Sequence, residues 1–226
     1  MSLLSARHLT KSFGQTPALQ GASFVINAGE VVAVMGTSGS GKTTLLHCLA
    51  GILQPDSGEV MFGDQRVDEM SEAKRSVLRR KEFGFVFQFG QLVPELTAEE
   101  NIALPLLLNG VNRKTALTEA RPWFSELDID GLHERRSGEL SGGQAQRVAI
   151  ARAMVAGPKV VFADEPTGSL DSISGEHVLT LLTSTARERG TTVIIVTHDA
   201  RVAAYADREV IVRDGIVTSL TTGPIA

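Results

Sequence analysis

A glycine-rich segment that ends in a lysine and two threonines could hold the phosphates of a nucleotide. Residues 36–43 read GTSGSGKT and follow the apolar run 31–35 directly. The glycines allow successive backbone N–H groups to point at one phosphate, and the helix expected next adds its own free N–H groups. The lysine then contacts the β- and γ-phosphates, while the following hydroxyl ligates Mg²⁺. The sequence therefore predicts a nucleoside triphosphate site made by Gly36, Ser38, Gly39, Ser40, Gly41, Lys42, Thr43 and Thr44.

Two adjacent carboxylates supply the chemistry that such a phosphate site needs. Asp164 and Glu165 end the apolar run 160–163. An aspartate at the end of a buried strand can hold Mg²⁺ through water, as in other phosphate-loop proteins. The glutamate beside it is then placed to take a proton from the attacking water or to orient it. A solvated turn is the alternative for an isolated Asp-Glu pair, and the phosphate loop in the same chain weakens that alternative.

A second candidate anion site lies at the segment LSGGQ, residues 140–144. Ser141 can cap the helix that follows, and Gly142 and Gly143 leave backbone N–H groups open at the positive end of that helix, before Gln144. This site has no lysine of its own, and one nucleotide needs only one phosphate cradle. The sequence therefore favours a second site that serves a nucleotide held by another copy of the chain.

The segment LSGGQ matches the signature of the ATP-binding cassette (ABC) ATPases, and the chain resembles this family over nearly its whole length. The resemblance implies that Gln88 is a Mg²⁺ and water ligand that communicates with a transport partner. Asp171 corresponds to a loop that reaches across a dimer interface, and His198 corresponds to a γ-phosphate contact. Phe13 stands where an aromatic ring stacks on adenine, a position that is more often tyrosine in the family.

The resemblance also implies a mechanism and a set of ligands. Two chains close head to tail on two ATP molecules, each held between one phosphate loop and the signature of the other chain. Glu165, His198 and Gln88 are then the catalytic residues, and Thr43, Gln88 and Asp164 are the Mg²⁺ ligands. The expected cofactors are ATP and Mg²⁺, and the expected assembly is a homodimer with separately encoded membrane permease subunits.

The elements that must position these residues alternate between strands and helices. Continuous apolar runs at 31–35, 83–87, 160–163 and 192–196 are typical of strands buried on both faces of a parallel sheet. The first thirty residues instead predict an antiparallel edge, and residues 213–216 predict a hairpin turn. Helices are expected at 43–53, 71–81, 98–108, 112–127, 144–156 and 174–189.

Together these elements predict an α/β fold of the P-loop NTPase class. The resemblance specifies an ABC cassette with a RecA-like, mainly parallel sheet core, an antiparallel β edge and a helical subdomain at about 89–140. We expect residues 1–226 to form a single ABC ATPase domain.

Composition narrows the classes of protein further. The 226 residues carry 22 Lys and Arg against 26 Asp and Glu, a formal net charge of −4, which argues against nucleic acid as a partner. One cysteine cannot form an internal disulfide. We find no apolar run of about 18 residues and no signal-peptide pattern at the N-terminus. The chain is therefore expected to be soluble and intracellular. The family resemblance further implies that a permease holds it at the cytoplasmic face of a bacterial plasma membrane.

Residues 78–102 are similar to the macrolide-exporter and lipoprotein-release branch of the family, which works with a four-span permease. Ser169 is a mild departure, because that branch often has asparagine there. The leading interpretation is the ATPase of an exporter or extraction complex for haem, an antimicrobial peptide, a drug or a lipoprotein. A cell-division type ATPase that transmits force to an extracellular hydrolase, or an importer for amino acids, remains an alternative.

An apolar segment after Gln88 is a candidate for permease docking. It has little regular pattern and lies beside a catalytic loop. The core of the helical subdomain is the alternative place for it. The residues of this docking hypothesis are Phe89, Leu92, Val93 and Leu96.

Overall fold

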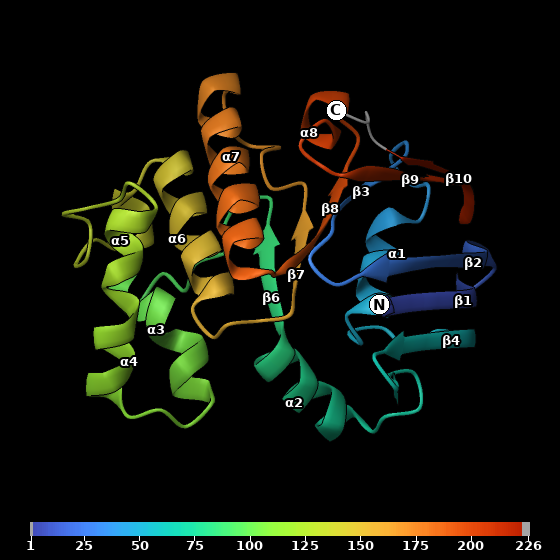
Figure 1. Cartoon of the computed structure of the whole chain (residues 1–226), viewed down its shortest axis with the longest axis horizontal. Helices are drawn as coiled ribbons and strands as arrows, with labels where there is room; N and C mark the ends of the chain where they lie inside the picture. Colours follow the sequence, from blue (N-terminus) through green and yellow to red (C-terminus); the bar gives the residue numbers. More distant parts are fainter. Residues whose placement is uncertain (1, 223–226) are drawn as a thin grey trace.

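The centre of the protein is a six-stranded sheet in a computed structural model that describes residues 2–222 (Figure 1). Its strand order is β10 (Ile216–Thr222), β9 (Arg208–Arg213), β3 (Val31–Met35), β8 (Thr192–Thr197), β7 (Val160–Asp164) and β6 (Phe83–Phe87). Every neighbouring pair is parallel except β9 and β10, which form an antiparallel hairpin. The expectation of a mainly parallel sheet is confirmed, and so is the predicted turn between β9 and β10.

The parallel strands are buried on both faces because the sheet separates two hydrophobic cores. Successive residues of one strand point to opposite sides. Accordingly Val161 and Val193 belong to the core under the helices, whereas Val160 and Ile194 belong to the core under the N-terminal sheet. All four are fully buried. This explains why these strands are continuous apolar runs rather than alternating patterns.

A second, antiparallel sheet covers one side. It consists of β2 (Thr16–Asn27), β1 (Ser2–Phe13), β4 (Ser57–Phe62) and β5 (Gln65–Arg66), in that order. Helix α1 (Lys42–Leu49) packs between this sheet and the central one through Leu45 and Leu49. The N-terminal antiparallel strands were expected from the alternation of their residues, whereas β4 and β5 were not.

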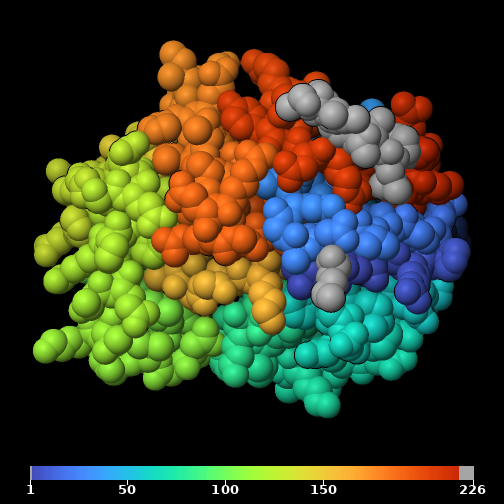
Figure 2. Space-filling view, viewed as in Figure 1, coloured from blue at the N-terminus to red at the C-terminus, as the bar shows by residue number. Residues whose placement is uncertain are grey.

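Most of the remaining helices cover the opposite face, whereas the helix at 72–82 contributes Leu78 to the core under the N-terminal sheet. Figure 2 shows the segment around residues 98–130, in yellow-green, gathered at one side of the molecule, with the N-terminal sheet at the other. Among residues 2–222, no helix is long and apolar enough to cross a membrane. The helices are α2 (Glu72–Glu82), α3 (Ala98–Leu108), α4 (Arg113–Ala120), α5 (Pro122–Glu126), the 3-10 turn η1 (Ser137–Glu139), α6 (Gly142–Met154), α7 (Ser172–Arg189) and α8 (Ala200–Ala203).

The single helix expected at 112–127 is wrong in one respect. The structure divides it into α4 and α5, with Arg121 between them and Pro122 as the first residue of α5. Proline has no N–H to donate to the carbonyl four residues earlier, and its ring crowds that carbonyl. The first helix also ends earlier than expected, at Leu49, because Gly51 takes a left-handed conformation with φ 63°.

Candidate functional site

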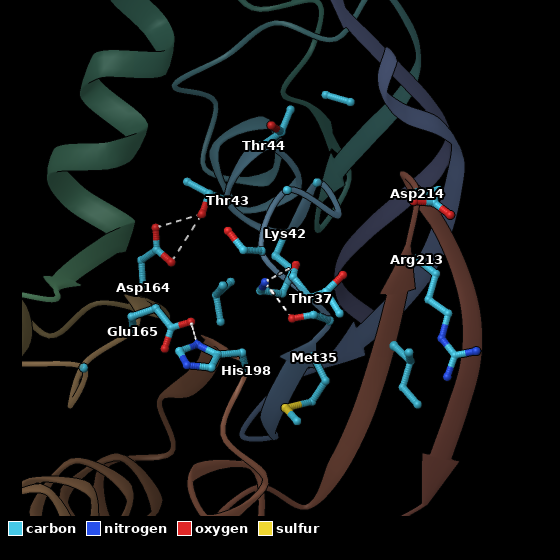
Figure 3. Close-up of a pocket in the computed structure, with 18 of the residues that line it drawn as sticks. Met35, Thr37, Lys42, Thr43, Thr44, Asp164, Glu165, His198, Arg213 and Asp214 are labelled. Carbon is cyan, nitrogen blue, oxygen red and sulfur yellow. Dashed lines mark hydrogen bonds and ion pairs between the residues drawn. The ribbon is translucent and has the colours of Figure 1, made fainter. Parts of the chain in front are cut away.

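A cleft of about 1110 Å³ lies where the central strands end (Figure 3). The ends of β3, β6, β7 and β8 reach it from the sheet, and β9 and the β9–β10 turn form one wall. Ligands of parallel α/β sheets bind at this carboxyl edge, because the loops that leave the strands converge there. All the predicted nucleotide, metal and catalytic residues line this cleft except Ser40.

The loop between β3 and α1 is built to expose backbone N–H groups. Gly41 occupies the N-cap of α1 with φ 101°, and within the described chain no side chain caps this helix end. A Cβ atom on Gly41 would lie 2.2 Å from the carbonyl oxygen of Ala18, so only glycine fits here. The uncapped helix start therefore presents its positive end to the cleft.

Lys42 places a buried positive charge inside this loop. Its Nζ atom donates to the carbonyl oxygens of Gly36, at 2.8 Å, and Thr37, at 2.9 Å. The ammonium group is thus held at the mouth of the loop, where a phosphate oxygen can become an additional acceptor. Ser40 is buried beneath the same loop, and its carbonyl accepts from the N–H of Gly215. Its contribution is to tie the loop to the β9–β10 turn.

Thr43 and Asp164 bring two oxygen donors together from opposite sides of the cleft. Thr43 Oγ1 lies 3.2 Å from Asp164 Oδ2. Burial raises the pKa of the Asp164 carboxyl, and the neighbouring charge of Glu165 adds to this effect, whereas the hydrogen bond from Thr43 opposes it. A hydroxyl and a carboxylate, with the amide of Gln88 in the same cleft, form an all-oxygen donor set that fits Mg²⁺.

Glu165 and His198, which the sequence predicts to be catalytic, contact each other in the cleft. His198 Nδ1 lies 2.6 Å from Glu165 Oε1 (Figure 3). Glu165 has a left-handed backbone with φ 47°, which is unusual for a residue other than glycine. The conformation is held by backbone hydrogen bonds from Glu165 to Val196 and from Gly168 to Glu165. Such strain is typical of functional sites, where the surrounding structure fixes one side-chain direction.

The turn around Gln88 is held by three side chains, of which only Ser169 stands out in the sequence. Gln146 donates to the carbonyl of Phe87, and Ser169 donates to the carbonyl of Gln88. Arg152 donates to the carbonyls of residues 90 and 91, and burial lowers the pKa of its guanidinium group. Gln146 and Arg152 belong to α6, so the helix that starts at the LSGGQ segment also fixes the position of this turn. In sequence, the only signal was the departure at Ser169.

The LSGGQ segment itself lies outside the cleft of its own chain. Ser141 caps α6 by accepting from the N–H of Gln144, and the Gln144 side chain accepts in return from the N–H of Ser141. Ser141 and Gly142 are exposed, and Gly143 is half-buried. Asp171 caps α7 in the same manner, through the N–H of Ser174. One chain therefore does not bring these residues to its own phosphate loop.

The four candidate docking residues differ in their surroundings. The side chain of Phe89 is 70% exposed, on the turn that Gln146, Ser169 and Arg152 hold. Leu92 is half-buried and packs against the core under the helices, and Val93 and Leu96 are also half-buried. Phe89 is therefore the member of this group that offers a free apolar surface.

Comparisons with known sequences agree with this arrangement. A model of the family described as ABC transporter matches residues 19–168. The chain is 43% identical over 217 residues to the lipoprotein-releasing system ATP-binding protein LolD of Porphyromonas gingivalis. The aligned residues cover 96% of this chain and 99% of that protein. It is 45% identical over 221 residues to the LolD protein of Syntrophotalea carbinolica, with 96% and 97% covered.

Solved structures share the fold at comparable coverage. The dimeric, post-hydrolysis structure of the ATP-binding cassette MJ0796 bound to ADP and Pi matches with a TM-score of 0.89 and 34% identity, over 99% of this chain and 100% of that chain. The structure of cbiO1 from Clostridium perfringens, part of the ABC transporter complex cbiONQ, matches with a TM-score of 0.88 and 31% identity, over 98% and 88%.

Proposed function

Because this chain belongs to the ABC transporter family and is an ATP-hydrolysing cassette of that family, we propose that it drives a complex that extracts lipoproteins from a bacterial plasma membrane. The support for lipoproteins as the substrate class is the similarity to LolD proteins over nearly the full length of both chains. We further propose that residues 1–226 act as one cassette, with residues 89–140 as its helical subdomain.

One observation supports ATP hydrolysis as the driving reaction. A single cleft is lined by Lys42, Thr43, Asp164, Glu165 and His198. The N–H groups of the phosphate loop and Lys42 orient the β- and γ-phosphates of ATP. The exposed ring of Phe13, which lines the same cleft, offers a face for the adenine. In hydrolysis, the oxygen of a water molecule bonds to the γ-phosphorus, the bond to the β–γ bridging oxygen breaks, and Glu165 takes the proton of the water.

Thr43, Asp164 and Gln88 would hold Mg²⁺, which supplies neutralisation of the charge on the phosphate oxygens. The chain's own residues supply the remaining positive field, from Lys42 and the start of α1. His198 is suited to contact the γ-phosphate, because it lines the cleft next to Glu165.

The active assembly in this proposal is a homodimer. The exposed LSGGQ segment lies outside the cleft of its own chain, so a second copy is needed to bring it to a bound nucleotide. The similarity to dimeric cassette structures supports the same arrangement. Ser141, Gly142, Gly143, Gln144 and Asp171 would then act across the interface.

We place the dimer on the cytoplasmic face of the membrane, attached to permease subunits encoded separately. Phe89 is the proposed docking contact, because it is a large exposed apolar side chain on a turn fixed by α6.

The Phe89→Asp variant is expected to lose copurification with the coexpressed permease, because a carboxylate replaces an apolar contact. Its ATP affinity should stay within about twofold of the parent, since Phe89 does not line the nucleotide cleft. Val25→Asp, on β2 of the antiparallel sheet, is a matched control at another exposed apolar residue. Unchanged copurification of Phe89→Asp would remove this residue from the docking site.

The substrate class is tested with the complex in lipid vesicles. We expect an acylated lipoprotein to stimulate ATP hydrolysis and to be released from the vesicles only when ATP is present. Haem, an antimicrobial peptide and a macrolide serve as comparison substrates. Stimulation by one of these, without stimulation by the lipoprotein, would overturn the proposed substrate class and leave the ATPase assignment intact.

A further inference from the structure

Thr197 is a buried polar residue next to the catalytic pair that does not line the cleft. It is the last residue of β8, between Val196 and His198, and its side chain is 1% exposed. Both of its neighbours in sequence reach the cleft, whereas Thr197 points into the protein behind it. A hydroxyl group in this position cannot touch the nucleotide, and its burial requires hydrogen-bond partners within the protein.

The Thr197 hydroxyl uses its donor and its acceptor on two parts of the active site. It donates to Glu165 Oε2 at 3.3 Å and accepts from the N–H of Asp199 at 3.1 Å. Asp199 in turn caps α8 by accepting from the N–H of Arg201. One hydroxyl therefore links the carboxylate of Glu165 to the turn that carries His198.

The two oxygens of the Glu165 carboxylate have different partners. His198 lies against Oε1, and Thr197 holds Oε2. The imidazole of His198 has a second nitrogen, Nε2, so His198 can face a γ-phosphate while its Nδ1 atom stays beside Oε1. Thr197 is buried and does not line the cleft, so its contact with Oε2 can persist when a nucleotide binds.

From this geometry we infer that Thr197 is a positioning residue that holds the Glu165 carboxylate in the orientation for proton abstraction from water. The inference rests on the proposed role of Glu165 as the base. A misplacement of about 1 Å at a reacting group can lower a rate by about 100-fold. The hydroxyl of Thr197 therefore acts on the chemical step rather than on ATP binding.

The test compares Thr197→Val, which keeps the shape and removes the hydroxyl, with Thr197→Ser, which keeps the hydroxyl. For Thr197→Val we expect kcat to fall by about 10- to 100-fold, with the KM for ATP and the affinity for a non-hydrolysable ATP analogue within about twofold. Thr197→Ser should recover most of kcat. Thr183→Val removes another buried threonine hydroxyl, on α7, and should leave kcat unchanged.

A double variant separates a positioning role from a general loss of structure. If Thr197 acts through Glu165, adding Thr197→Val to Glu165→Gln should change the residual single-turnover rate by less than about twofold. A normal kcat in Thr197→Val, or a loss that Thr197→Ser does not recover, would overturn the inference. Normal hydrolysis by Glu165→Gln alone would instead overturn the proposed role of the base, so the two failures are distinguishable.

Discussion

Replacing Glu165 with glutamine is expected to lower ATP turnover by a factor of about 10² to 10⁴, the range that a positioned general base contributes. The amide has nearly the same shape, so the contacts of the phosphate loop with ATP remain. It cannot accept the proton of the attacking water, however, and the chemical step loses its base. ATP binding, measured with a fluorescent analogue, should therefore stay close to that of the parent chain.

Glu188→Gln is a suitable control for this variant. Glu188 is an exposed residue near the end of α7, and the same change there should leave turnover unaltered. Hydrolysis by Glu165→Gln at the rate of the parent would show that another group takes the proton, and the roles proposed for Glu165 and Thr197 would both fail.

Replacing Lys42 with alanine is expected to weaken ATP binding by about tenfold or more, because hydrogen bonds to a charged group contribute about 1.5 to 3 kcal/mol. In the parent chain, part of the binding free energy from Lys42 is offset, because its ammonium group already donates to the carbonyls of Gly36 and Thr37. Truncation removes the positive charge from the mouth of the loop and leaves the N–H groups of α1 to bind the phosphates alone. Isothermal titration with ATP measures the change.

Lys114→Ala provides the matched control, since Lys114 is exposed on α4. Loss of ATP affinity in Lys42→Ala alone would agree with the proposed phosphate site. Equal affinities of the parent and the Lys42→Ala variant would contradict the assignment of residues 36–44 as that site.

The sequence was most informative where local spacing determines local structure. The strands that carry Asp164 and His198 are unbroken apolar runs, and a parallel sheet requires such runs because both of its faces are buried. The phosphate loop could also be recognised from its sequence. The structure explains one of its glycines, because a Cβ atom on Gly41 would collide with the backbone of Ala18. The structure brings the residues expected at the nucleotide together in one cleft, except that Ser40 is buried below the loop and does not line the cleft.

Contacts between distant segments could not be predicted in this way. Arg152 is the eleventh residue of α6 and reads as an ordinary polar residue in an amphipathic helix, yet it holds two carbonyls of the turn after Gln88. The role inferred for Thr197 depends on a pairing between the ends of β7 and β8, which register in the sheet determines. Pro122 is itself a signal for a break between helices. The helical periodicity on both sides of it nevertheless favoured a single helix.

In the proposed dimer, one chain holds only half of each working ATP site. The most direct test is the mass of the Glu165→Gln variant in solution, measured by light scattering with ATP, with ADP and without nucleotide. We expect the mass of one chain without nucleotide or with ADP, and the mass of two chains with two bound nucleotides when ATP is present. A variant that binds ATP at saturation and remains at the mass of one chain would contradict the proposed dimer.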